Sequence, residues 1–182
     1  MAADLHRYFF AFLPPDQMAR QMVQEAVRLD PGAQHQRADR VHSTIGITDD
    51  FPSPRPEVAA ALLAVGQGIA ADPFICQFDR IMARPGYMAL RLSRRSRPMG
   101  DLFRQIESGM RRKGCKLREG YAHDPHITLS YRGGLSCNRL VPGYRWLVED
   151  LVLIHSHVGE TRHDILGRWS LSGAEGPQLS LF

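Results

Sequence analysis

Two copies of a short pattern, a histidine followed two residues later by a threonine, are the residues of this chain best suited to chemistry. His42 and Thr44 form the first copy, and His126 and Thr128 form the second. Both copies lie in apolar, β-branched stretches, and residues i and i+2 of a strand share one face. An imidazole can give or take a proton near neutral pH, and a threonine hydroxyl can donate a hydrogen bond to an anionic oxygen. Two such pairs facing one another would place an acid, a base and two oxyanion donors around a phosphate.

The first half of the chain has the pattern of a strand, a helix and a motif strand. Residues 6–13 are short, aromatic and stopped by two prolines, which indicates a buried strand. Residues 16–29 carry apolar side chains at roughly helical spacing. The first motif lies in a strand predicted at 41–48, and a second helix is predicted over 57–69, after a loop with three prolines.

The second half repeats this order. Its predicted elements are two hairpin strands at 74–83 and 87–92, a helix at 98–113, the second motif strand at 126–131, and closing strands at 146–155 and 164–171. The recurrence predicts two similar α+β lobes within a single domain spanning residues 1–182. We expect the tail from about residue 172 to be loosely held.

Composition and charge are those of an ordinary globular protein. The chain is 43% hydrophobic and 23% charged, and its net charge of +4 is compatible with an anionic partner without requiring one. The three cysteines, Cys76, Cys115 and Cys137, form no CxxC pair and support neither a disulfide framework nor a cysteine zinc site, so a reducing cytoplasm fits best. No apolar run approaches the roughly 18 residues of a membrane span, and the amino terminus has no secretory layout.

Five short stretches carry a resemblance to a known family. They are, in chain order, Arg7-Tyr8-Phe9-Phe10-Ala11-Phe12-Leu13-Pro14, His42-Ser43-Thr44-Ile45, His126-Ile127-Thr128-Leu129, Leu153-Ile154-His155-Ser156 and Gly167-Arg168-Trp169. With these stretches the chain resembles the two-histidine phosphoesterases, and most of all the bacterial RNA 2′,3′-cyclic phosphodiesterases, also named 2′-5′ RNA ligases. The resemblance implies an α+β fold of two pseudo-symmetric lobes, with antiparallel sheets lining a central cleft, helices on the outside and one motif from each lobe.

The same resemblance implies metal-free hydrolysis of a terminal 2′,3′-cyclic phosphate to a 2′-phosphate. It assigns His126 as the base and His42 as the acid, although the symmetry of the motifs alone gives no order. Thr44 and Thr128 would bind the phosphate oxygens.

Further contacts are expected beside the second motif. Family members often carry an arginine three residues after the threonine, where this chain has Tyr131, with Arg132 one position later. Regular alternation would place Arg132 on the face of His126 and Thr128, with Tyr131 on the opposite face, so we expect Arg132 to bind phosphate. Three aromatic side chains are candidates for substrate contact: Phe9, Phe51 and Tyr131.

Other basic residues have competing interpretations. His155 and His157 share one strand face, a spacing that some zinc sites use, but no third histidine or carboxylate stands at a motif spacing, so we expect structural or rim roles. Arg91, Arg94, Arg95 and Arg97 either hold RNA or form a solvated loop.

The sequence therefore predicts a cytoplasmic, monomeric, metal-independent cyclic phosphodiesterase that uses no cofactor and acts on RNA 3′ ends or small cyclic nucleotides. One alternative is 2′-5′ RNA ligation, which uses the same two histidines. The other is a noncatalytic module that binds RNA ends or nucleotides. Intact histidines and threonines in both motifs argue against this last alternative, because a pure binder needs no proton carriers.

Overall fold

A computed structural model of the chain describes residues 5–160 and 162–173. Its elements in chain order are β1 (Leu5–Phe12), α1 (Asp16–Leu29), β2 (Gln34–His35), the 3-10 turn η1 (Ala38–Arg40), β3 (Ser43–Ile47), α2 (Pro56–Gln67), β4 (Phe74–Arg84), β5 (Tyr87–Arg91), α3 (Arg97–Arg112), β6 (His126–Tyr131), β7 (Cys137–Val148), β8 (Asp150–Val158) and β9 (Arg162–Ser170). Beyond residue 173, the tail that we expected to be loosely held lies outside the described residues.

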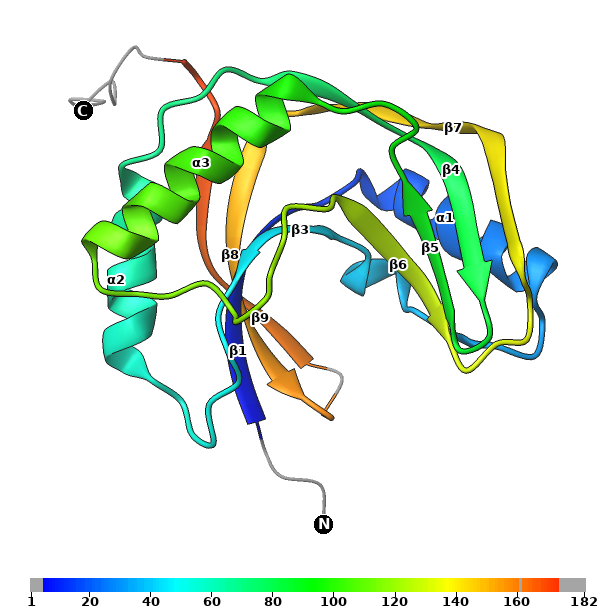
Figure 1. Cartoon of the computed structure of the whole chain (residues 1–182), viewed down its shortest axis with the longest axis horizontal. Helices are drawn as coiled ribbons and strands as arrows, with labels where there is room; N and C mark the ends of the chain where they lie inside the picture. The colour runs from blue at the N-terminus through cyan, green and yellow to red at the C-terminus, as the bar shows by residue number, and fades with distance from the viewer. Residues whose placement is uncertain (1–4, 161, 174–182) are drawn as a thin grey trace.

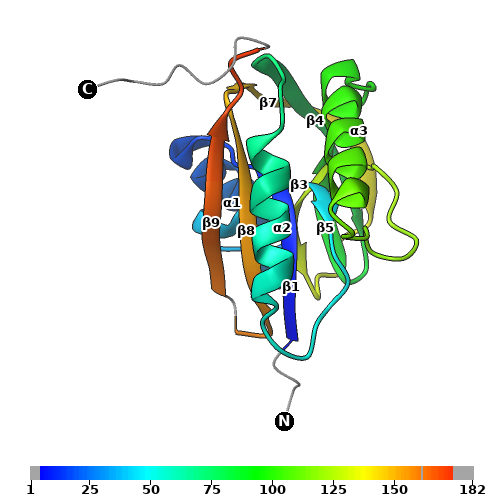
Figure 2. The ribbon, with the colours of Figure 1, turned by 90° about the vertical axis from the view of Figure 1, so that its left-hand side faces the viewer.

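Within the described residues, the strands form one nine-stranded antiparallel sheet in the order β7-β4-β5-β6-β3-β1-β8-β9, with β2 paired to β6. The two motif strands, β6 and β3, are neighbours in the middle of this order and divide it into two lobes. Figure 1 shows the sheet bent into an arch, with α2 and α3 over one lobe and α1 against the other. Figure 2, turned by 90°, shows α2 lying over the strands of its lobe. The expected α+β fold of two lobes is confirmed, with the strands of both lobes joined in one sheet.

The long aromatic run of β1 is explained by burial on both faces of the sheet. Tyr8, Phe10 and Phe12 belong to the main core, which also holds side chains from α1, α2 and α3. Phe9 and Ala11 point to the other face and pack with apolar residues of β8 in a smaller cluster. The sequence of a strand buried on both faces is a continuous apolar run, whereas in a half-exposed strand apolar and polar residues alternate. The helices therefore lie on one face, and the opposite face near Phe9 is available for a site.

The ends of α3 follow from local chemistry. The Ser96 hydroxyl accepts a hydrogen bond from the Met99 backbone N–H at the start of the helix, and Pro98 lies in the first turn. Gly114, predicted to stop the helix, has a φ of 72°, a left-handed conformation that glycine adopts without a Cβ clash.

The prediction of a single strand over residues 146–155 was wrong. Strand β7 ends at Val148 and β8 begins at Asp150, so the chain reverses around Glu149. Much of β7 went unpredicted because most of residues 137–145 carry exposed or half-buried side chains without a clear alternation. An edge strand of this kind is held by its backbone ladder with β4, which leaves a weak hydrophobic pattern in the sequence.

Candidate active site

The two motifs lie side by side at the junction of the lobes. Ser43 of β3 is directly opposite Ile127 of β6 in an antiparallel pair. Extending this register by one residue in each direction sets His42 beside Thr128 and Thr44 beside His126. All four side chains line one cavity of about 320 Å³, here called the motif cavity. The structure thus brings together the four residues that sequence reasoning paired, each histidine next to the threonine of the other motif.

A backbone carbonyl orients each imidazole in the same way. The Nδ1 atom of His42 lies 2.7 Å from the carbonyl oxygen of Arg40, and the Nδ1 atom of His126 lies 2.8 Å from that of Asp124. A carbonyl can only accept, so Nδ1 carries a proton in both rings, and Nε2 is left as the nitrogen that can exchange one. The two motifs therefore present equivalent proton carriers.

The surroundings of His42 break this symmetry. Its ring stacks on Phe9, with centroids 4.8 Å apart, and meets the ring of His163 edge-on at 5.4 Å. Burial, and to a smaller degree the charges of Arg40 and His126, lower the pKa of His42 from 6.5 to about 4. At neutral pH, His42 in the free protein is consequently an uncharged imidazole suited to accept a proton. This favours His42 as the base, the reverse of the order that the family resemblance implies.

Three residues that sequence reasoning missed add to the motif cavity: Arg7, Arg40 and His163. The Arg40 guanidinium donates a hydrogen bond to His163 Nε2 at 2.9 Å, and burial, the largest cause, lowers the pKa of His163 to about 3. Arg7 forms an ion pair with Asp50 at 2.8 Å. The alternation of side chains along a strand could have found Arg7, because it lies two residues before the candidate Phe9 and so shares its face. No comparable signal marks Arg40, which lies in a short 3-10 turn.

The expected positions of Tyr131 and Arg132 were wrong. Across the β5–β6 pair, Met88 is opposite Ser130 while Ala89 is opposite Thr128, so Leu129 is an extra residue in β6. Such a bulge interrupts the alternation of side chains. Tyr131 consequently lines the motif cavity, whereas Arg132 is exposed, has a φ of 55° and is absent from the cavity lining.

The two phenylalanines named as substrate contacts lie on different faces of β1. Phe9 lines the motif cavity, as expected. Phe51 bridges to His6 through the backbone and packs against the main core, with its ring centroid 6.2 Å from that of Tyr8. The prediction that Phe51 contacts the substrate is therefore wrong, because Phe51 packs on the core side of the sheet and does not line the motif cavity.

A second, larger cavity of about 740 Å³ adjoins the second motif. This cavity, here called the arginine pocket, is lined by several basic side chains: Arg91, Arg94, Arg95, Arg97, Arg104 and His123. Arg91 is opposite His126 in the β5–β6 register and forms an ion pair with Asp124, whose carbonyl holds the His126 ring. The arginine pocket therefore lies next to the strand of the second motif, and the two cavities share no lining residue.

Solved structures with the same fold were found, although no family model and no curated protein matches the sequence. E. coli LigT, solved in complex with 3′-AMP, aligns with a TM-score of 0.78 at 21% identity, over 92% of this chain and 99% of that chain. TT0787 of Thermus thermophilus aligns at 0.75 and 19% identity, over 92% of this chain and 99% of its own. For the MHV ns2 PDE domain the values are 0.58, 17%, 82% and 99%.

These structures are members of the two-histidine phosphoesterase superfamily, so the fold implied by the sequence resemblance is confirmed. At such identities the likeness establishes the fold. Among the helices of the described residues, none is long and apolar enough to cross a membrane.

Proposed function

We propose that the protein is a phosphodiesterase that hydrolyses 2′,3′-cyclic phosphates at RNA ends or on nucleotides to 2′-phosphates, without a metal ion. The observation that carries the proposal is the cross-strand set of His42, Thr44, His126 and Thr128 around one cavity, with both Nδ1 atoms held by carbonyls. We further propose that it acts as a monomer. The three free cysteines suit a reducing compartment such as the cytoplasm.

The reaction adds one water across one bond. The neutral base accepts a proton from water as the water oxygen attacks phosphorus, and the P–O3′ bond breaks. The protonated second histidine donates its proton to the departing O3′, which leaves a 2′-phosphate and a free 3′-hydroxyl. In this proposal His42 is the base and His126 the acid. Hydroxyl donors from Thr44 and Thr128 stabilise charge on the nonbridging oxygens.

The cationic lining of the motif cavity supports an anionic substrate. Arg7 and Arg40 both face it, and Tyr131 borders it with a phenol that can contact a sugar or a base. LigT, which shares the fold, has been solved with 3′-AMP, ATP and NADP+, which supports a nucleotide as the bound group.

Ligation is the second candidate. In ligation a 5′-hydroxyl replaces water as the attacking group: a P–O5′ bond forms, the P–O3′ bond breaks, one histidine accepts the proton of the 5′-hydroxyl and the other donates a proton to O3′. In the reverse reaction the 3′-hydroxyl attacks phosphorus, the 2′-5′ bond is cleaved and the cyclic phosphate forms again. The LigT fold supports this interpretation as much as hydrolysis.

The decisive experiment uses a short RNA ending in a 2′,3′-cyclic phosphate, with ³¹P NMR or mass spectrometry to assign the product. We expect a 2′-phosphate, formed roughly a hundredfold or more slowly by a His42→Ala/His126→Ala double variant than by the wild type. A second reaction containing a 5′-hydroxyl RNA tests joining, and resistance of the product to a 3′-5′-specific nuclease identifies a 2′-5′ bond. A 3′-phosphate product, or equal turnover by the double variant, would refute the proposal.

The arginine pocket should distinguish RNA from small cyclic nucleotides. We expect an Arg94→Gln/Arg95→Gln/Arg97→Gln variant to raise KM for a cyclic-phosphate oligonucleotide by roughly tenfold or more at low salt. The variant lacks three guanidinium groups that would contact the phosphates of a single strand. The salt dependence of KM should also become shallower. KM for a cyclic mononucleotide should not change.

The matched control for that variant is Arg111→Gln/Arg112→Gln. It removes cations at the end of α3, where they offset the helix dipole. Equal loss on both substrates, or an equal loss in the control, would show that the arginine pocket does not bind RNA.

A further inference from the structure

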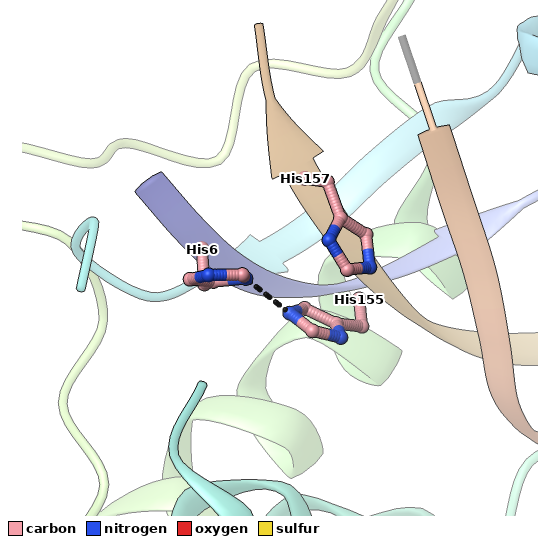
Figure 3. A group of neighbouring side chains, drawn as sticks. All are labelled: His6, His155 and His157. Carbon is pink, nitrogen blue, oxygen red and sulfur yellow. Dashed lines mark hydrogen bonds between the residues drawn. The ribbon is translucent and has the colours of Figure 1, made fainter. Parts of the chain in front are cut away.

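A second group of histidines lies behind the motif cavity, on the other face of β1 and β8. His6 is opposite His157 in the β1–β8 register, and His155, two residues before His157 on β8, is opposite Tyr8. Figure 3 shows the three rings gathered over the two strands. The neighbouring Arg7 and Ser156 point the other way and line the motif cavity, as alternation requires. His157, at the strand end, also borders that cavity.

The distances within this histidine cluster suit a metal ion. One ligating nitrogen from each ring lies within 4.8 Å of the other two. His6 Nδ1 and His155 Nε2 are 3.0 Å apart. Two nitrogens bound tetrahedrally to zinc at ~2.0–2.1 Å lie about 3.3 Å apart, so only a small shift separates the hydrogen-bonded arrangement from a ligated one.

A carboxylate orients the third ring. His157 Nε2 lies 2.9 Å from an oxygen of Asp164 on β9, and Arg162 forms an ion pair with the same carboxylate. A ring N–H donated to a carboxylate fixes the tautomer of a metal-bound histidine and makes its other nitrogen a better ligand. In His157 that other nitrogen is Nδ1.

Two of the three rings are buried. Only 4% of His6 and 9% of His155 is exposed, and the His155 ring stacks on Tyr8 with centroids 4.7 Å apart. Burial first, and then the nearby rings of His157 and His6, lower the pKa of His155. Imidazoles bind a metal ion in their neutral form.

We propose that His6, His155 and His157 bind one divalent transition-metal ion, with zinc the best match to three imidazoles. The site is separate from the proton carriers His42 and His126 and serves to join β1 to β8. Those strands carry Arg7, Phe9 and Ser156 into the motif cavity from their opposite face, so the metal supports the wall of that cavity without entering the reaction.

The test is metal binding by chelator-treated protein. Zinc chloride titrated in a calorimeter should bind at one equivalent per chain. Cobalt chloride, used as an optical probe, should give the visible bands of a four-coordinate site, and zinc should abolish them. At zinc concentrations about 100 times Kd, Tm should rise by roughly 5 to 10 °C. Absence of zinc and cobalt binding to the wild type at millimolar concentrations would overturn the proposal.

Three variants locate the site. His6→Asn retains an amide near the position of Nδ1 but is a poor zinc ligand, and it should weaken binding by at least a hundredfold. Asp164→Asn should weaken binding by about 10 to 100-fold, and it decides the question if circular dichroism shows that His6→Asn is unfolded. His42→Ala is the control and should bind zinc with unchanged Kd and stoichiometry. Unchanged Kd in both His6→Asn and Asp164→Asn, or loss of binding in His42→Ala, would refute the assignment.

Chelation separates this site from the proposed reaction. EDTA should lower Tm while leaving turnover of a cyclic phosphate at 25 °C unchanged, and folded His6→Asn should be as active as the wild type. Loss of turnover with EDTA and recovery with zinc would overturn both the supporting role of the metal and metal-free hydrolysis. Loss of zinc binding alone would leave the proposed hydrolysis intact.

Discussion

Replacing either His42 or His126 by alanine is expected to lower kcat for a 2′,3′-cyclic phosphate by about 10² to 10⁴, because each loss removes one proton transfer from the transition state. The double variant should be little worse than the poorer single variant, since the two groups act in one step. Single-turnover kinetics on a cyclic mononucleotide measure the effect without interference from product release. Neither variant should unfold, because both rings line the motif cavity and not the main core.

Thr44→Val and Thr128→Val are the matched controls. Each removes a hydroxyl donor and keeps the side-chain shape, so kcat should fall by about 10 to 100-fold, the value of one hydrogen bond to a charged group. The pH dependence should keep both limbs, because a threonine carries no exchangeable charge in this range. A threonine variant as impaired as a histidine variant, with a lost limb, would contradict this division of roles.

The second large effect concerns pH. We expect kcat/KM of the wild type to be bell-shaped, since this parameter reports ionisation in the free protein. Activity should rise with pH through about 4 as His42 becomes neutral and able to accept a proton. It should fall again at higher pH, where the group that must donate a proton to the leaving oxygen is deprotonated. The groups facing His42 are Arg40, His126 and His163, so the two limbs belong to a coupled system.

The pH profile shows how many ionising groups the reaction needs but does not show which histidine is the acid. A substrate with a different leaving group is needed to assign the acid. An activated diester such as bis(p-nitrophenyl) phosphate releases a phenolate that departs without protonation. We expect this substrate to restore most of the activity of His126→Ala and little of the activity of His42→Ala, because His42 must still deprotonate water. Rescue of His42→Ala alone would restore the order implied by the family resemblance.

The elements that the sequence predicted well are those with a strong local pattern. The amphipathic α1 and α3, and the aromatic β1 closed by two prolines, have boundaries within one or two residues of those expected. Strand β7 escaped prediction because an edge strand with many exposed side chains has no clear hydrophobic period.

The parts of the site that could not be predicted depend on pairing between distant segments. The bulge at Leu129 exchanges the faces of Tyr131 and Arg132, and it arises from the pairing of β6 with β5. His6 joins His155 and His157 only because β1 lies beside β8, so the third ring of the histidine cluster could not be found by local spacing. The motifs themselves were predictable because each is contained in three consecutive residues.

The junction between β3 and β6 has a mechanical consequence. Within the described sheet, Ser43 opposite Ile127 is the single residue pair that joins the two motif strands, whereas the strands within each lobe are paired over longer ladders. The weakest strand pairing of the sheet therefore lies between the strands that carry the motifs of His42 and His126. A phosphate bound by both motifs would bridge this pairing and hold the two lobes at one distance from each other. The substrate would in this way set the gap across which its own protons are exchanged.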